Sequence, residues 1–250
     1  DTAHWEKGRD YVMADTGDDF PDEYDAVIRI EEVSFREDGT PAFSCDTPVA
    51  PGTGVRPAGS TIRKGDLLIQ ANQVIRPTDL SALAMGGAQR VPVWKRPVVA
   101  FLPTGSELIA WDKTPKRGDN IDSNSLMVAE MVKAMGAEVI SYPIVADVLE
   151  SLHDVLHDAL AKADLVIING GSSRGGEDYS TRLIREEGEL ILHQVAAVPG
   201  RPMAFGLVQG KAVINLPGPP LAAYFGTDWC IRALLDHWLM HETWPRHMEK

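Results

Sequence analysis

Three acidic side chains, Glu107, Asp147 and Asp178, each lie at or just past the end of an apolar run and beside the start of a helical pattern. A carboxylate in that position is often only the N-cap of the helix. Three carboxylates beside a phosphate would also suit Mg²⁺, which takes one or two of them together with ligand oxygens. The residue types therefore leave two roles open for each acid, a helix cap or a metal ligand.

Three turns rich in glycine, serine and proline follow the first, the third and the last apolar runs of the region after residue 97. They are "PTGSEL" at 103–108, "NGGSSRGGEDY" at 169–179 and "LPGPP" at 216–220. Glycine lets the backbone approach a ligand closely, and serine hydroxyls with backbone N–H groups can bind a phosphate. Because the carboxyl ends of strands form the ligand crevice of an open α/β sheet, the three turns together favour a binding cleft.

Alternating apolar patterns after residue 97 predict the elements that position these turns. Strands are expected at 98–103, 137–145, 164–168 and 189–195, helices at 122–136, 147–163 and 177–188, a hairpin at 203–216 that turns at Gln209-Gly210, and a last helix after "PGPP". Strand–helix alternation of this length implies an α/β fold, a mainly parallel sheet with helices on both faces.

The region before residue 97 has a different pattern. Its apolar runs, 25–33, 61–70 and 91–94, are short and broken by glycine and proline, which predicts a smaller β-rich region. One short helix is expected at 79–86, capped by Asp79 or Thr78.

Polar residues also predict caps for the later helices. Asp122 or Ser123 is expected to cap the helix at 122–136, and Asp147 with Glu150 resembles a capping box.

Composition limits the classes of partner. The chain has 250 residues and a net charge of −12, which argues against nucleic-acid or anionic-membrane partners because these need a basic surface. No apolar run is long enough to span a bilayer. Cys45 and Cys230 form no CxxC motif, so two buried thiols in a reducing cytoplasm are expected rather than a disulfide framework or a structural zinc site.

Two histidine pairs have a spacing of four residues, His153 with His157 and His237 with His241. Neither pair has the HExxH form of a zinc protease, and polar pairs at this spacing commonly mark a solvated helix face. GxGxxG, GxxxxGK[ST] and GxSxG are also absent, which removes the main support for a Rossmann dehydrogenase, a P-loop NTPase or an α/β-hydrolase.

A series of short motifs follows in a fixed order: "TGSEL", "DSNS", "GAEV", "VAD", "NGGSSRGGEDY", "VPGRPMAFG" and "LPGPP". This order resembles the MoeA/gephyrin E-domain family, the molybdopterin molybdenumtransferases. That family usually shows TGDEL, DSN or DTN, GGVSVG followed by DY, KPGKP with AFG, and LPGNP. Upstream, residues 16–33 and 51–69 resemble further family segments, so the resemblance covers nearly the whole chain.

The resemblance implies a function and a set of site residues. Family members insert molybdate into adenylylated molybdopterin with Mg²⁺ and release AMP, and they are elongated dimers of MogA-like fold. Carried over by motif, the catalytic residues are Glu107, Asp147, Asp178 and Arg201, of which the three acids also hold Mg²⁺. The ligand-binding residues are Thr104, Gly105, Asp122, Ser123, Asn124, Gly170, Gly171, Ser172, Ser173, Arg174, Pro217 and Gly218.

The resemblance also implies domain limits and partners. Residues 1–57 correspond to the β-rich MoeA domain II, 58–96 to a linking part of domain I, 97–242 to the molybdopterin-binding α/β domain, and 243–250 to the start of a missing C-terminal region. A cytoplasmic homodimer is expected, with a MogA-type protein or a molybdoenzyme as a further partner.

Several positions depart from the family pattern. Val198 and Arg201 replace the two lysines of KPGKP, and Ser60 replaces an acid. Arginine can still bind an oxyanion through two hydrogen bonds, but valine cannot. An alternative therefore stays open, a carrier, sensor or scaffold that binds molybdopterin without inserting metal. An enzyme acting in the same cleft on another nucleotide-linked substrate is a further alternative, as is tungsten in place of molybdenum.

Overall fold

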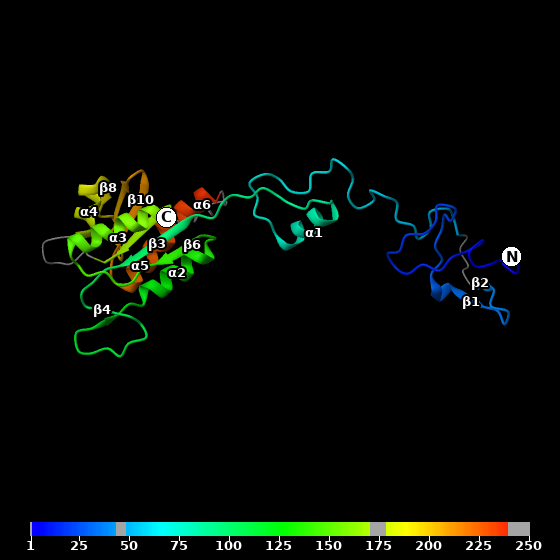
Figure 1. Ribbon diagram of the computed structural model, residues 1–250, viewed down its shortest axis with the longest axis horizontal. Helices are drawn as coiled ribbons and strands as arrows, with labels where there is room; N and C mark the ends of the chain where they lie inside the picture. Colours follow the sequence, from blue (N-terminus) through cyan, green and yellow to red (C-terminus); the bar gives the residue numbers. More distant parts are fainter. Residues whose placement is uncertain (1, 44–48, 171–178, 240–250) are drawn as a thin grey trace. The chain divides into compact units, whose positions relative to one another are not determined.

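The structure is a computed structural model that describes residues 2–43, 49–170 and 179–239 (Figure 1). The chain divides into two compact units. The first comprises residues 1–70 and 75–89, and the second comprises residues 71–74 and 90–250.

The second unit is built on a six-stranded sheet. Its strands in spatial order are β6 (Glu138–Ser141), β3 (Val98–Pro103), β7 (Leu165–Asn169), β10 (Lys211–Leu216), β9 (Ala204–Val208) and β8 (Gly188–His193). β6, β3, β7 and β10 are parallel, whereas β9 is antiparallel to both of its neighbours. Because the parallel strands point the same way, the loops that leave β3, β6, β7 and β10 gather at one edge.

Helices cover both faces of this sheet (Figure 1). They are α2 (Asn124–Ala134), α3 (Leu149–Lys162), α4 (Tyr179–Glu187), α5 (Pro220–Gly226) and α6 (Arg232–Trp238), with a π-helical turn at Thr227–Ile231. Side chains of β3 alternate between two buried clusters. Ala100 and Leu102 pack with α3 and α4, whereas Val99 and Phe101 pack with α2 and α6. The predicted mainly parallel sheet with helices on both faces is confirmed.

The hairpin is also confirmed at the predicted turn. β9 and β10 pair antiparallel, and Gln209 and Gly210 between them have φ angles of 52° and 74°. Positive φ at both central residues is the geometry that lets a two-residue turn follow the strand twist. The predicted strand at 137–145 is shorter, since regular pairing covers only Glu138–Ser141.

Two of the predicted helix caps are wrong. α1 (Pro77–Met85) is preceded by Arg76 as N-cap, and Asp79 is the third helical residue, whose carboxylate accepts a hydrogen bond from the Arg76 amide. α3 is preceded by Val148, and the Asp147 side chain bonds to Thr104 instead of capping the helix. For Asp147, the tertiary hydrogen bond to Thr104 replaces the predicted local capping bond.

The cap of α2 is confirmed with a refinement. Ser123 occupies the N-cap position but makes no capping bond, and Asp122 accepts hydrogen bonds from the Ser125 amide, at 3.0 Å, and from its hydroxyl. Gly136 follows the helix with a φ of 93°, as expected for a glycine that ends a helix.

The first unit is small and β-rich, with two strands among its described residues. β1 (Val33–Phe35) follows a 3-10 turn at Ile30–Glu32 and pairs antiparallel with β2 (Pro41–Phe43). Residues 61–70, and residues 91–94 of the second unit, form no strand. Apolar side chains of the first unit surround a cavity of about 600 Å³, lined by residues that include Trp5, Tyr11, Phe20, Tyr24, Phe35 and Phe43.

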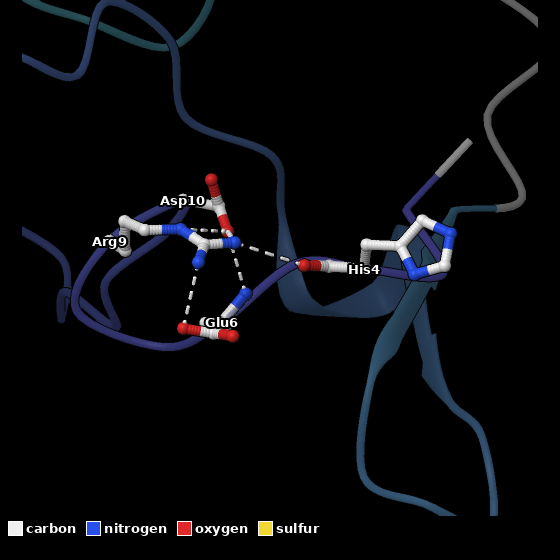
Figure 2. A network of polar contacts seen from close by, with 4 residues as sticks. All are labelled: His4, Glu6, Arg9 and Asp10. Carbon is white, nitrogen blue, oxygen red and sulfur yellow. Dashed lines mark hydrogen bonds and ion pairs between the residues drawn. The ribbon is translucent and has the colours of Figure 1, made fainter.

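A polar network fixes the first turn of the described chain (Figure 2). The Asp10 carboxylate accepts hydrogen bonds from the Glu6 amide at 2.8 Å and from the Arg9 guanidinium at 2.7 Å. Arg9 also contacts the Glu6 carboxylate at 2.9 Å and donates to the His4 carbonyl oxygen at 3.2 Å. The Arg9 hydrogen bond, followed by the Glu6 amide, lowers the pKa of Asp10. The network orders the turn, but such exposed pairs add little stability.

No helix among the described residues is both long and apolar enough to cross a membrane.

The contact between Tyr142, which directly follows β6, and Asp158 of α3 generates a prediction. Tyr142 donates a hydrogen bond of 2.6 Å to Asp158, and burial, with this bond as the second cause, raises the pKa of Tyr142 to about 12. Because the folded state holds the phenol proton more tightly, this group stabilises the fold below pH about 10 and ceases to do so as the pH rises towards 12. We expect Tyr142→Phe to remove the latest step of a tyrosinate absorbance titration.

Asp158→Asn is the matched control for this titration. It should lower the late pKa only in part, because burial is the larger cause. An unchanged titration curve in Tyr142→Phe would contradict the assignment.

Candidate ligand-binding cleft

A cavity of about 650 Å³ opens at the carboxyl edge of the parallel strands. It is bounded by the segments that follow β3, β6, β7 and β10, which is where the glycine-rich turns were expected to meet. The lining residues are Thr104, Glu107, Leu108, Asn120, Ile121, Asp122, Ser123, Asn124, Asp147, Asn169, Gly170, Gly218, Pro219 and Pro220.

Thr104 connects two of the loops. It directly follows β3, forms a parallel bridge with Val145, and its hydroxyl donates a hydrogen bond to the Asp147 carboxylate. Thr104 is 3% exposed and Asp147 is half-buried, so this bond is partly shielded from water and orients the carboxylate. The sequence places Asp147 far from the β3 turn, and the bridge brings both into one wall of the cleft.

Glu107 and Asp147 line the same cavity, as predicted. Glu107 is exposed, whereas Asp147 is half-buried. Neither carboxylate forms an ion pair with a cation of residues 2–43, 49–170 or 179–239. Two carboxylates without such a partner, in a cleft that also holds hydroxyl and amide oxygens, form a donor set that suits Mg²⁺. The residues present therefore fit the ion that the family resemblance implies.

An asparagine network forms the opposite wall. Asn124, the first residue of α2, donates hydrogen bonds to the side chain of Asn169 at 2.9 Å and to the Gly218 carbonyl at 2.7 Å. Asn169 donates in turn to the Pro217 carbonyl at 2.8 Å. The Asn124 Oδ1 atom is buried and accepts no hydrogen bond from the described residues. The network fixes α2, β7 and the β10–α5 turn relative to one another.

Two further predicted residues of this wall differ in what they can offer a ligand. The Asp122 carboxylate is buried and already accepts two hydrogen bonds from Ser125. Ser123 is exposed, and its hydroxyl makes no capping bond. Asp122 therefore shapes the start of α2, while Ser123 remains available to a ligand.

Among the described glycines that line the cleft, Gly170 is the one that the backbone strictly requires. Its φ is 120°, and a Cβ atom there would lie 2.3 Å from the Thr104 carbonyl oxygen. The loop after β7 can leave the sheet at this angle only because the residue has no side chain. At Gly218, by contrast, a Cβ atom would meet nothing within 4 Å, so the surrounding space does not require a glycine there.

The remaining predicted residues do not line the cavity or lie outside the described part of the chain. Gly105 donates its amide to the Val145 carbonyl at 3.2 Å, and Pro217 accepts from Asn169, so both support the wall without lining it. Arg201 is exposed in the turn between β8 and β9 and is not among the lining residues. Gly171, Ser172, Ser173, Arg174 and Asp178 lie outside the described residues.

Sequence reasoning missed Asn169 as part of the site. It is the last residue of β7 and the hub of the asparagine network. A polar residue that ends a fully apolar strand just before a glycine-rich turn is the signal that could have identified it. Asn120 and Ile121 were missed too, because they reach the cleft through β5 (Asn120–Ile121), which pairs with β4 (Leu108–Ile109) in a two-stranded sheet.

An open α/β sheet with a polar cleft at its carboxyl edge defines a ligand-binding class of α/β domain. Residues 100–237 match the family model described as "Probable molybdopterin binding domain", and residues 2–87 match the MoeA N-terminal region, domains I and II. The chain belongs to the MoeA family of molybdopterin-biosynthesis proteins.

Curated relatives agree with this assignment. The chain is 32% identical over 208 residues to a molybdopterin molybdenumtransferase of Haemophilus influenzae, which covers 83% of this chain and 51% of the relative. It is 31% identical over 223 residues to one of Staphylococcus aureus, which covers 89% of this chain and 52% of the relative. The chain thus spans about half the length of the curated relatives it matches.

Solved structures give the same picture. A molybdopterin biosynthesis MoeA protein of Pyrococcus horikosii superposes with a TM-score of 0.72 and 31% identity, over 88% of this chain and 54% of that chain. A structure of a molybdopterin biosynthesis MoeA protein from Pyrococcus horikoshii OT3 gives a TM-score of 0.64 and 25% identity, over 88% of this chain and 52% of that chain.

The cleft generates a prediction about Gly170. We expect Gly170→Ala to destabilise the second unit by about 2–4 kcal/mol, because the methyl group meets a carbonyl oxygen and the φ angle disfavours any side chain. Urea denaturation followed by circular dichroism measures the change.

Gly218→Ala is the matched control, since it adds the same methyl group to the same cleft where the space is open. It should change the free energy of unfolding by less than about 0.5 kcal/mol. Equal effects of the two substitutions would show that the close approach to Thr104 does not constrain the fold.

Proposed function

We propose that this protein acts in molybdenum cofactor biosynthesis, where it inserts molybdate into adenylylated molybdopterin and releases AMP in the cytoplasm. The observation that carries the proposal is the meeting of Glu107, Asp147 and Gly170 in one cavity, since these residues come from three of the family's motifs. The names of the curated relatives and the matched family models support the same activity.

Most residues of the cleft would bind the ligand or position other side chains. Ser123 and the glycine-rich turns at Gly170 and Gly218 would hold the pterin and its phosphate, together with Gly171, Ser172, Ser173 and Arg174 of the predicted loop. The Asn124–Asn169 pair would keep the pocket in shape for the ligand. Thr104 would act as a positioning residue, because it holds the carboxylate of Asp147.

Glu107 and Asp147, with Asp178 from the predicted loop, would hold Mg²⁺. When bound, the ion supplies neutralisation of the charge that develops on the leaving phosphate. The surroundings of Glu107 and Asp147 support this role, since binding a cation would break no ion pair between either carboxylate and any described residue. Arg201 would bind an oxyanion from the rim, in the place of a family lysine.

A non-catalytic carrier, sensor or scaffold is the second candidate function. Val198 favours it, because this residue is 89% exposed in the turn that carries Arg201 and offers no charge where the family has a lysine. Ser60, in place of a family acid, favours it as well.

A homodimer is the expected assembly, with a MogA-type protein or a molybdoenzyme as further partners. The first unit supports a dimer, since many of its large apolar side chains are exposed, among them Met13 at 57%, Phe35 at 51% and Leu67 at 77%. Light scattering of the purified protein would measure the assembly directly.

The activity is tested with purified protein, adenylylated molybdopterin, Mg²⁺ and molybdate, followed for AMP release and for active cofactor. We expect Glu107→Gln and Asp147→Asn each to slow AMP release by at least about a hundredfold, because each removes charge that balances the cation at the leaving phosphate.

Glu150→Gln is the control, since Glu150 is an exposed acid in the first turn of α3 that does not line the cleft. Tight pterin binding without AMP release in the wild-type protein would reject the transferase and favour the carrier. Absence of pterin binding would reject both candidate functions.

A further inference from the structure

Two histidines of α3 converge with a glutamate of α4, away from the cleft. The Nε2 atom of His153 lies 3.4 Å from one carboxylate oxygen of Glu187, and the Nε2 atom of His157 lies 3.0 Å from the other. The two imidazole rings have centroids 4.4 Å apart. Three side chains of types that bind metal ions therefore face one point from two helices.

Their spacing suits a metal ion. One ligand atom from each of the three side chains can be chosen so that all lie within 4.8 Å of one another. A tetrahedral ion with bonds of about 2.0–2.1 Å keeps its ligand atoms about 3.3 Å apart, so small side-chain rotations would close the site. Histidines four residues apart on a helix already project from the same face.

The other nitrogen of each ring has a polar neighbour that orients it. The Nδ1 atom of His153 lies 3.3 Å from the Asp154 carboxylate, and the Nδ1 atom of His157 lies 2.9 Å from the Gln209 side-chain amide. Metal-binding histidines usually donate this second N–H to a carboxylate or carbonyl oxygen. Asp154 can accept directly, and Gln209 can accept from His157 once its amide turns to present Oε1.

The ligand types decide the class of ion. Two imidazoles and one carboxylate suit Zn²⁺, Co²⁺, Ni²⁺ or Cu²⁺, whereas Mg²⁺ and Ca²⁺ prefer oxygen ligands alone. The side chains of His153, His157 and Glu187 are 45%, 34% and 26% exposed, so an ion can reach them from solvent.

The cluster is separate from the cleft. Gln209 lies in the turn before β10, at the opposite end of that strand from Leu216 and the cleft. The two sites also differ in chemistry. The described residues that line the cleft include no histidine, whereas two of the three side chains in the cluster are imidazoles.

We propose that His153, His157 and Glu187 bind one divalent transition-metal ion, with Zn²⁺ as the natural occupant and a water molecule at the fourth position. The ion joins the middle of α3 to the end of α4, where the chain enters β8. It stabilises this face of the sheet and is independent of the Mg²⁺ proposed for the cleft.

The test uses the full chain, without an affinity tag, after a chelator has stripped it of metal and dialysis has removed the chelator. Isothermal titration with Zn²⁺ should show one ion per chain, and titration with Mg²⁺ should show no binding at this site. Zinc at about a hundred times its Kd should raise the ratio of folded to unfolded protein about a hundredfold, which a rise in the thermal midpoint reports.

Ligand variants assign the ion to these residues. His153→Ala, His157→Ala and Glu187→Gln should each weaken zinc binding by at least about tenfold, and Gln209→Ala should weaken it by less because Gln209 only positions a ring. Co²⁺ gives a second readout, since its visible absorption is intense in a tetrahedral site and should fade in the same variants.

Two control variants make the test specific. Glu186→Gln removes the neighbouring acid of α4, which pairs with Arg182 at 2.7 Å, and should keep the wild-type zinc affinity. His237→Ala alters the other histidine pair and should also keep it. Absence of zinc binding would overturn the proposal, and so would zinc binding that the His153, His157 and Glu187 variants leave unchanged.

Discussion

The pairing of β3 with β7 is the constraint on which the rest of the second unit depends. Their register sets Pro103 opposite Asn169, and the amide of Thr104 continues it with a hydrogen bond of 3.0 Å to the Asn169 carbonyl. The next step brings the Gly170 backbone against the Thr104 carbonyl oxygen, where no side chain fits. The two loops that form the floor of the cleft are thus locked together by backbone contacts before any functional side chain is placed.

The walls of the cleft then follow from single polar side chains. The Thr104 hydroxyl donates a hydrogen bond to Asp147 and so connects the loop after β6 to this floor. The Asn169 side chain accepts a hydrogen bond from Asn124 and donates one to the Pro217 carbonyl in the turn after β10. Buried hydrogen bonds of this kind are costly to break because the freed groups cannot reach water. The buried bonds from Asn124 to Asn169 and from Asn169 to Pro217 therefore fix this side of the cleft to the sheet.

The sequence predicted the elements of the second unit well, because their apolar patterns are long and regular. Leu152, Leu156 and Leu160 mark one face of α3, and all three are buried against the sheet. The capping roles that local reasoning predicted for Asp147 and Asp79 were wrong. The partner of Asp147 is Thr104, 43 residues away in the chain, and no local pattern contains that information.

The first unit and the histidine cluster show the same limit. The apolar runs at 61–70 and 91–94 have the composition of strands, but they pair with no strand among the described residues. A segment forms a stable strand only when it pairs with another. His153 and His157 suggested a solvated face because polar pairs four residues apart on a helix commonly do. Glu187 and Gln209 approach from two other elements, and only the folded sheet brings them to this face.

Charge balance links the cleft to the departures from the family pattern. The protein has a net charge of −12, and Glu107 and Asp147 line its cleft. An anionic ligand in this cleft would be repelled unless positive charge lay close to it. Backbone N–H groups and hydroxyls contribute only partial charges. On the proposed function, a divalent cation held by the two acids would cancel their charge, and Arg201 with Arg174 would supply positive side-chain charge for the anion. The exposed Val198 carries no charge, so on the same proposal the cleft would depend more on its cation than the usual family pattern does.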